Sequence, residues 1–203
     1  MKQNDAGNVF PIWSVCLGYE TVAVITSGNP NNMSTLSPVR GEINVLNTMK
    51  FVNNSDRGYI LGDLPERLIQ KLTTGQGVMF YDHNWIVSMD TYNNNKNLSS
   101  FWKVITESTS PYNEKFVALW EARKYPFYGM QYHPEKNSFE WKINADRSFD
   151  AIQIEQIMAN KFMEKARQSK NSFASYDEYQ KYSIYNFQPT ATTFPFSRIY
   201  RFP

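Results

Sequence analysis

The feature that most limits how this chain can fold is the meeting of two different structural patterns at a single residue, Cys16. Residues 9–15 form a short apolar run, which is typical of a buried strand. Residues 17–26 predict a helix, which residues 27–30 end with a Gly- and Pro-containing turn. A strand, a sharp turn and a helix in this order are typical of a nucleophile elbow, in which the turn lifts one side chain out of the sheet edge.

The residues around Cys16 suit a reactive thiol. Ser14 and Gly18 are small, so the turn can close without a steric clash. The start of the following helix places its dipole and free N–H groups near the sulfur, which favours the thiolate. The N–H of Leu17 could donate to a developing oxyanion. A lone cysteine is more often a small buried apolar side chain, and this pattern alone leaves both interpretations open.

The chain has two histidines, and each has a functional and a structural interpretation. Pro134 favours an extended conformation for His133, so that Glu135 points to the same side and can orient the imidazole. That geometry predicts a cysteine–histidine–carboxylate triad, whereas the alternative is a surface histidine at a strand end. His83 could bind a substrate carboxylate or a tetrahedral intermediate, or could be a loop histidine beside Asp82.

Composition narrows the class of protein. The 203 residues suffice for one domain, and 41% hydrophobic residues suffice for a core. The net charge of +2 is made of interspersed charges, so we expect neither a nucleic acid nor a membrane partner. One cysteine excludes an intramolecular disulfide, and no cysteine and histidine pair has zinc-ligand spacing, so we expect no metal. Residues 1–9 are polar and lack the apolar core of a signal peptide.

The rest of the chain mixes strand and helix patterns and therefore predicts an α/β fold, although the order of the strands does not follow from pattern. Asp63, Pro65 and Glu66 predict a helix start with a capping box, and this helix should run to about residue 72. The Asn-rich residues 92–97 predict a loop, and the aromatic tail from Ser183 predicts an extended segment packed on the body. Short strands are expected at 42–46, 77–81, 85–88, 101–106, 116–121 and 127–132, and the clearest helix at 149–167.

Four segments of the chain carry a resemblance to a known family. They are Pro11–Glu20 (PIWSVCLGYE), His83–Trp85 (HNW), Tyr125–Lys136 (YPFYGMQYHPEK) with Phe139–Lys142 (FEWK), and Ile184–Pro189 (IYNFQP). In this order, across nearly the whole chain, they resemble the gamma-glutamyl hydrolase family, within the class I glutamine amidotransferase-like superfamily, and the third segment is the strongest match. Glu20, four residues after the cysteine, is similar to gamma-glutamyl hydrolases, whereas glutamine amidotransferases usually have Gln there.

The resemblance implies a fold and an activity. The fold is a three-layer, flavodoxin-like sheet with helices on both faces, forming a single domain over residues 1–203 that is incomplete at its N-terminus by roughly a third. The activity is cysteine-dependent hydrolysis of gamma-glutamyl bonds, with folylpoly-gamma-glutamates as expected substrates and no cofactor. The implied catalytic residues are Cys16, His133 and Glu135, the oxyanion donor is Leu17, and the substrate-binding residues are His83, Glu20 and Trp85.

Two features depart from the family pattern. Ser14 stands where the family usually has Gly, and only fifteen residues precede Cys16. Two other functions therefore stay open: a catalytically impaired remnant that binds a ligand or partner, and a glutamine amidotransferase subunit. The resemblance further implies a lysosomal, vacuolar or extracellular location and is compatible with a homodimer.

Overall fold

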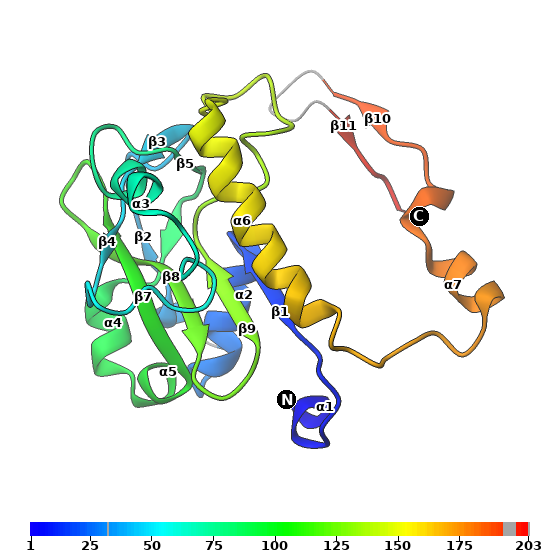
Figure 1. Cartoon of the computed structure of the whole chain (residues 1–203). Coiled ribbons are helices and arrows are strands. Elements are labelled where there is room, and N and C mark those ends of the chain that lie inside the picture. The colour runs from blue at the N-terminus through cyan, green and yellow to red at the C-terminus, as the bar shows by residue number, and fades with distance from the viewer. Residues whose placement is uncertain (32, 193–197, 203) are drawn as a thin grey trace.

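A five-stranded mixed sheet forms the centre of the protein (Figure 1). The computed structural model describes residues 1–31, 33–192 and 198–202. Strands β1 and β9 are parallel, and every other neighbouring pair in this sheet is antiparallel. The strands follow the order β1 (Ile12–Val15), β9 (Phe127–Met130), β8 (Lys115–Ala122), β7 (Trp102–Thr109) and β4 (Lys50–Phe51).

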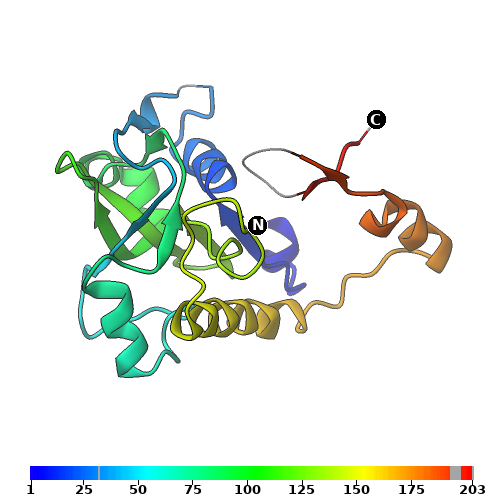
Figure 2. The same cartoon turned by 90° about the horizontal axis from the view of Figure 1, so that it is seen from above.

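Helices cover both faces of this sheet, which confirms the predicted three-layer α/β architecture (Figure 2). Helices α3 (Glu66–Thr73) and α6 (Phe149–Ala166) pack on one face. Helices α2 (Leu17–Thr26), α4 (Met89–Asn94) and α5 (Lys96–Phe101) pack on the other. Side chains of β8 enter both cores, as a strand buried on both faces requires: Val117 and Trp120 lie in one core, and Phe116, Ala118 and Leu119 lie in the other.

Helix α2 is held to the sheet by aromatic side chains. Tyr19 is fully buried, stacks on Trp120 at 4.6 Å and donates a hydrogen bond to the carbonyl of Val117. Trp120 stacks in turn on Trp102, whose indole N–H donates to Thr26 at the end of the helix. Because both ends of α2 are anchored in this way, its first turn beside Cys16 has a defined position.

Two small antiparallel ladders lie outside the main sheet and hold the segment that carries His83. Strand β3 (Val45–Asn47) pairs with β5 (Met79–Tyr81), and β2 (Ser37–Pro38) pairs with β6 (Trp85–Ile86). The segment between β5 and β6 is therefore tied down at both ends. Two further short helices are α1 (Lys2–Asp5) and η1 (Met33–Thr35).

Two local predictions were wrong. The Asn-rich residues 92–97 are not a loop, because α4 ends at Asn94 and α5 begins at Lys96. Asn95 separates the helices, and its side chain caps α5 by accepting from two backbone N–H groups. The predicted capping box is also absent from α3, which begins at Glu66 with Pro65 as its N-cap, while Asp63 pairs with Lys161.

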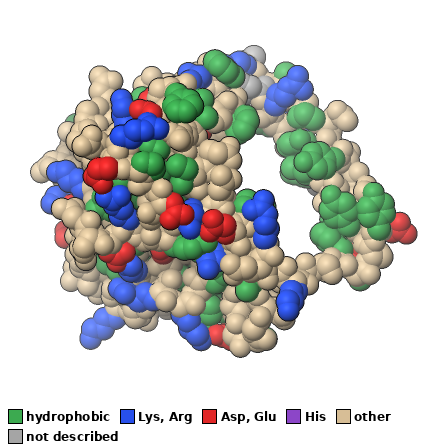
Figure 3. Space-filling view, in the orientation of Figure 1, with side chains coloured by type: hydrophobic (Ala, Val, Ile, Leu, Met, Phe, Trp, Pro, Cys, Tyr) green, Lys and Arg blue, Asp and Glu red, His purple; other side chains and the backbone are tan. Residues whose placement is uncertain are grey.

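The C-terminal segment, residues 169–192 and 198–202, does not pack on the body as predicted. It contains α7 (Tyr176–Tyr182), η2 (Ile184–Asn186) and the ladder of β10 (Thr190–Ala191) with β11 (Arg198–Ile199). Figure 3 shows an opening between this segment and the body, with hydrophobic side chains gathered on the segment. Tyr176 and Tyr185 are 72% and 82% exposed. Hydrogen bonds reach the body through Asn171 to Val9 and through Lys142 to Thr192.

Candidate active site

The parallel pairing of β1 with β9 brings the ends of two distant segments together. Val15 lies opposite Met130, and the N–H of Cys16 donates to the Met130 carbonyl at 2.9 Å. Parallel strands end at the same edge of a sheet. Cys16 follows β1 by one residue and His133 follows β9 by three, so both side chains lie at that edge.

Cys16 occupies a tight strand-to-helix turn. Its backbone has φ 48° and ψ −111°, a conformation that costs energy for a residue with a β-carbon. Ser14 and Gly18 are neighbours across the turn, and a β-carbon on Gly18 would lie 3.7 Å from that of Ser14, at ordinary contact distance. The hydroxyl of Ser14 fits this site because it donates to the Tyr128 carbonyl at 2.9 Å. The turn thus has the geometry of a nucleophile elbow, with Ser in a position that accepts it.

Helix α2 begins directly after the sulfur. Leu17 is its first residue, so the Leu17 N–H has no acceptor within the helix and lies beside the nucleophile. Its side chain is 72% exposed. The thiol also lies 3.8 Å from the carbonyl oxygen of Asp82, to which it can donate. The sulfur is therefore placed between a helix start and a backbone carbonyl.

His133 connects the sulfur to a carboxylate. Its Nδ1 lies 2.8 Å from Oε1 of Glu135, so Nε2 is the ring nitrogen left to interact with Cys16. The Nδ1 proton points to the carboxylate, because a carboxylate can only accept. Burial alone lowers the pKa of His133, but the hydrogen bonds to Cys16 and Glu135 outweigh it and raise the pKa to about 9. At neutral pH the imidazole is therefore protonated.

Cys16, His133 and Glu135 form a row, and Glu135 is its outer member. Its side chain is about half exposed, at 48%. Partial burial raises the pKa of its carboxyl, but the stronger combined effect of His133 and Lys136 lowers it below the ordinary value. Glu135 therefore stays ionised at neutral pH, as a group that orients and stabilises an imidazolium must.

His83 lies beneath the site rather than on its surface. Its side chain is 1% exposed, and its Nδ1 lies 3.1 Å from the carbonyl of Trp85. Burial lowers its pKa to about 4, and the charge of His133 contributes in the same direction. His83 is therefore neutral where His133 is charged, and the carbonyl of its neighbour Asp82 lies 3.8 Å from the sulfur.

The two other residues expected to bind substrate lie in contrasting surroundings. Glu20 is 8% exposed and accepts a hydrogen bond from Gln131 between α2 and the sheet, and burial raises its pKa. The side chain of Trp85 is 43% exposed. Trp85 thus offers an open ring, whereas Glu20 belongs to the interior.

Sequence reasoning missed three groups around the site. The Asp82 carbonyl beside the thiol is a backbone group, which no motif reports. Gln131 faces Glu20 only because β9 packs against α2. Glu42 faces His83 at 4.0 Å, from a segment that the pattern identified only as a short strand. Each depends on pairing between distant segments, so one sequence carries no direct signal for it.

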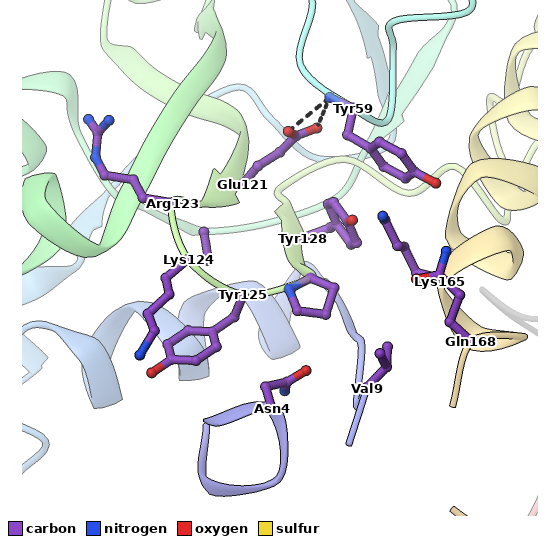
Figure 4. A pocket seen from close by; sticks show the side chains of 12 residues that line it. Asn4, Val9, Tyr59, Glu121, Arg123, Lys124, Tyr125, Tyr128, Lys165 and Gln168 are labelled. Atoms are coloured by element: carbon purple, nitrogen blue, oxygen red, sulfur yellow. Dashed lines mark hydrogen bonds between the residues drawn. The ribbon is translucent and has the colours of Figure 1, made fainter. Parts of the chain in front are cut away.

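A separate cavity of about 380 Å³ lies at the opposite end of β9 (Figure 4). Tyr59, Tyr128 and Lys165 line it, and the Glu121 carboxylate at its back accepts from the backbone N–H of Tyr59. Cys16 and His133 follow the other end of the strands, so this cavity is separate from the site that they form with Glu135. Among the described residues, no cluster of three metal-binding side chains occurs, and no described helix is both long and apolar enough to span a bilayer.

The chain is similar in sequence to one protein family and to several individual proteins. The family model for glutamine amidotransferase class-I matches residues 2–149. Gamma-glutamyl hydrolase 2 of Arabidopsis thaliana is 35% identical over 192 residues, which are 94% of this chain and 54% of the relative. Gamma-glutamyl hydrolase B of Dictyostelium discoideum and human gamma-glutamyl hydrolase are each 30% identical over 191 residues, 93% of this chain and 54% and 58% of the relatives. The chain thus spans little more than half the length of these relatives.

Proposed function

Because the chain belongs to the class-I glutamine amidotransferase family, we propose that it carries the chemistry of its gamma-glutamyl hydrolase relatives, the hydrolysis of gamma-glutamyl peptide bonds. The observation that carries this proposal is the row formed by Cys16, His133 and Glu135 at the shared end of β1 and β9. A thiol, an imidazole and a carboxylate that lie together at one sheet edge are the groups that nucleophilic acyl transfer needs.

The proposed reaction has two halves. The Cys16 thiolate attacks the gamma-linked carbonyl, and the Leu17 N–H donates to the oxyanion that develops. The imidazolium of His133 then protonates the departing amine, which leaves an acyl thioester. The neutral imidazole removes a proton from water, and the hydroxide cleaves the thioester and releases the free carboxylate and the thiolate.

The charge state of His133 supports this order of steps. Its pKa of about 9 keeps it protonated at neutral pH, so the resting site holds the acid that the first half requires. Ionised Glu135 stabilises that imidazolium and keeps Nδ1 as the donor. The geometry therefore supplies the proton donor, the orienting group and the nucleophile together.

The substrate that we propose is a folylpoly-gamma-glutamate, on the strength of the resemblance to the relatives. The decisive experiment incubates this compound with the wild-type chain and with Cys16→Ala, and measures released glutamate and short gamma-glutamyl peptides. Release by the wild type and not by the variant is the expected result. A parallel incubation with free L-glutamine separates this function from that of an amidotransferase subunit, which would release ammonia. Folded wild-type protein that releases neither product would contradict the proposal and favour a binding remnant.

A further inference from the structure

The inference concerns a buried acid that the proposed mechanism does not use. Glu42 is fully buried, and its Oε2 lies 4.0 Å from Nε2 of His83, whose side chain is 1% exposed. Among the described residues, neither of these two atoms has a hydrogen-bond partner. Two buried polar atoms that face each other without other partners are unusual, because buried polar groups are nearly always satisfied.

The hydrogen bond of His83 to Trp85 determines which atoms of His83 and Glu42 carry protons. The Trp85 carbonyl can only accept, so Nδ1 of His83 carries the proton that it receives. In the neutral ring, Nε2 is then a bare acceptor directed at Glu42. The matching partner is a protonated carboxyl, and an approach of about 1 Å would bring the two atoms to hydrogen-bond distance.

The surroundings of Glu42 favour this protonated state. Burial raises its pKa to about 7, against the hydrogen bond from Asn47, and Glu114 contributes in the same direction as burial. The titratable groups that act on the pair are Glu114 and Tyr81 near Glu42, and His133 near His83. The described neighbours of Glu42 therefore include no cation that would hold it ionised.

Glu42 also holds the segment that carries His83. The His83 N–H donates to the Glu42 carbonyl at 2.9 Å, and the neighbouring Asp82 carboxylate accepts from the Asn44 N–H. The Asp82 carbonyl lies 3.8 Å from the nucleophilic sulfur. The main chain of Glu42 thus holds a segment that borders the sulfur, and its side chain faces the imidazole that this segment carries.

We propose that Glu42 is a positioning residue, whose buried carboxyl holds the imidazole of His83 and so fixes the Asp82 carbonyl beside the nucleophile. This role rests on the proposed hydrolase function, but its structural part can be measured without turnover. Glu42 touches neither substrate nor the reacting atoms.

Two substitutions test the role. In Glu42→Gln the amide oxygen can accept from Asn47, as Oε1 of the acid does, and the NH₂ group then faces Nε2 of His83. This variant reproduces the protonated acid at every pH. In Glu42→Leu no donor is left. The matched controls are Glu121→Gln and Glu121→Leu, because Glu121 is also a buried acid that accepts backbone hydrogen bonds but lies at the other end of β9.

Nitrogen NMR of the histidine rings gives the first readout, and only two histidines contribute signals. We expect His83 of the wild type and of Glu42→Gln to be the neutral Nδ1–H tautomer at pH 6. Glu42→Leu should lose this single tautomer and shift the backbone signals of Asp82, while both Glu121 variants should change neither. An Nε2–H tautomer in the wild type, or unchanged His83 signals in folded Glu42→Leu, would overturn the proposal.

A pH series covers the case in which Glu42→Leu does not fold. Above about pH 7 the wild-type acid ionises and can no longer donate, whereas the amide of Glu42→Gln is unaffected. The Nε2 signal of His83 should therefore move between pH 6 and 8 in the wild type alone, and identical behaviour of the two proteins would refute the role.

Where the chain hydrolyses substrate, kcat should fall about tenfold in Glu42→Leu and stay within about twofold in Glu42→Gln. If the wild-type protein is inactive, the proposed hydrolase function is contradicted, and the NMR measurements alone decide whether Glu42 positions His83.

Discussion

The segments that follow β9 and β5 place one histidine each near the same sulfur, yet their surroundings give the two rings opposite charge states. His133 is partly exposed and bonded to Cys16 and Glu135, and its pKa rises to about 9. His83 is nearly fully buried and bonded to a neutral carbonyl, and its pKa falls to about 4. Burial opposes the charge of both rings, so the difference comes from their partners. Only His133, whose partners raise its pKa above neutral, can serve as an acid at neutral pH.

The largest expected effect comes from removing the charged ring. His133→Asn should slow alkylation of Cys16 by iodoacetamide at pH 6 by about 10²-fold, because no imidazolium is left to stabilise the thiolate. The matched variant His83→Asn should stay within a few-fold of the wild-type rate. Similar losses of alkylation rate in both variants would show that His133 is not the ring that activates Cys16.

The dependence of stability on pH sharpens the same contrast. Between pH 6.5 and about 9 the folded state holds a proton on His133 that the unfolded state has released. The stabilisation of the folded state by protonated His133 is therefore fully present below pH 6.5 and is lost as the pH rises through about 9. The loss is at most about 3 kcal/mol. His83 acts in reverse, because its contribution is present above 6.5 and lost as pH falls toward 4.

Urea unfolding of the wild type, His133→Asn and His83→Asn at several pH values measures both contributions. The loss of stability above pH 6.5 should be smaller in His133→Asn, and the loss on acidification should be smaller in His83→Asn. Curves that run parallel to the wild type in both variants would contradict the assigned charge states.

A smaller effect is expected from Glu135→Gln. The substitution removes a charge and a hydrogen bond that raise the pKa of His133, so the alkaline limit of hydrolysis should move to lower pH. At pH 9 we expect about a tenfold loss in kcat/KM, with less loss at pH 6. The profile of kcat/KM from pH 5 to 10 checks this, and an unchanged alkaline limit would show that Glu135 does not act through the ring.

The smallest effect concerns the exposed ring beside His83. Trp85→Ala should raise KM by about two- to fivefold and leave kcat nearly unchanged, because the side chain is 43% exposed and only its carbonyl binds His83. Initial rates over a range of substrate concentrations measure the two constants separately. A fall in kcat at constant KM would instead assign the ring a part in positioning His83.

Local patterns predicted the elements around the nucleophile well. The helix at 17–26 matches α2 residue for residue, and the elbow at Cys16 follows from a strand that meets a helix without a loop. The contact between His133 and Glu135 was predicted for the wrong reason. The segment is not extended as expected, because the Lys136 N–H donates to the His133 carbonyl at 3.3 Å and closes a turn that brings Glu135 back to the imidazole. These features depend on neighbours in the chain, which a sequence displays directly.

The features that the sequence did not predict depend on distant partners. Nothing in residues 12–15 or 127–130 states that these strands are parallel neighbours, yet this pairing joins Cys16 to His133. The helices flanking Asn95 were missed because Asn was taken as a loop residue, whereas one Asn here caps a helix. The exposed aromatic tail was expected to pack because its residues are apolar, and composition does not say whether a surface is available to receive them.

The left-handed backbone at Cys16 has a consequence for the stability of this fold. Glycine would occupy φ 48° and ψ −111° more readily than any residue with a β-carbon, so the thiol is held where the chain is less stable than it could be. A Cys16→Gly protein should therefore melt at a higher temperature than the wild type and be inert toward thiol reagents. A protein without the need for a reactive thiol would gain thermal stability from this one substitution, so the strain at Cys16 is a cost in folding that the proposed hydrolase chemistry accounts for.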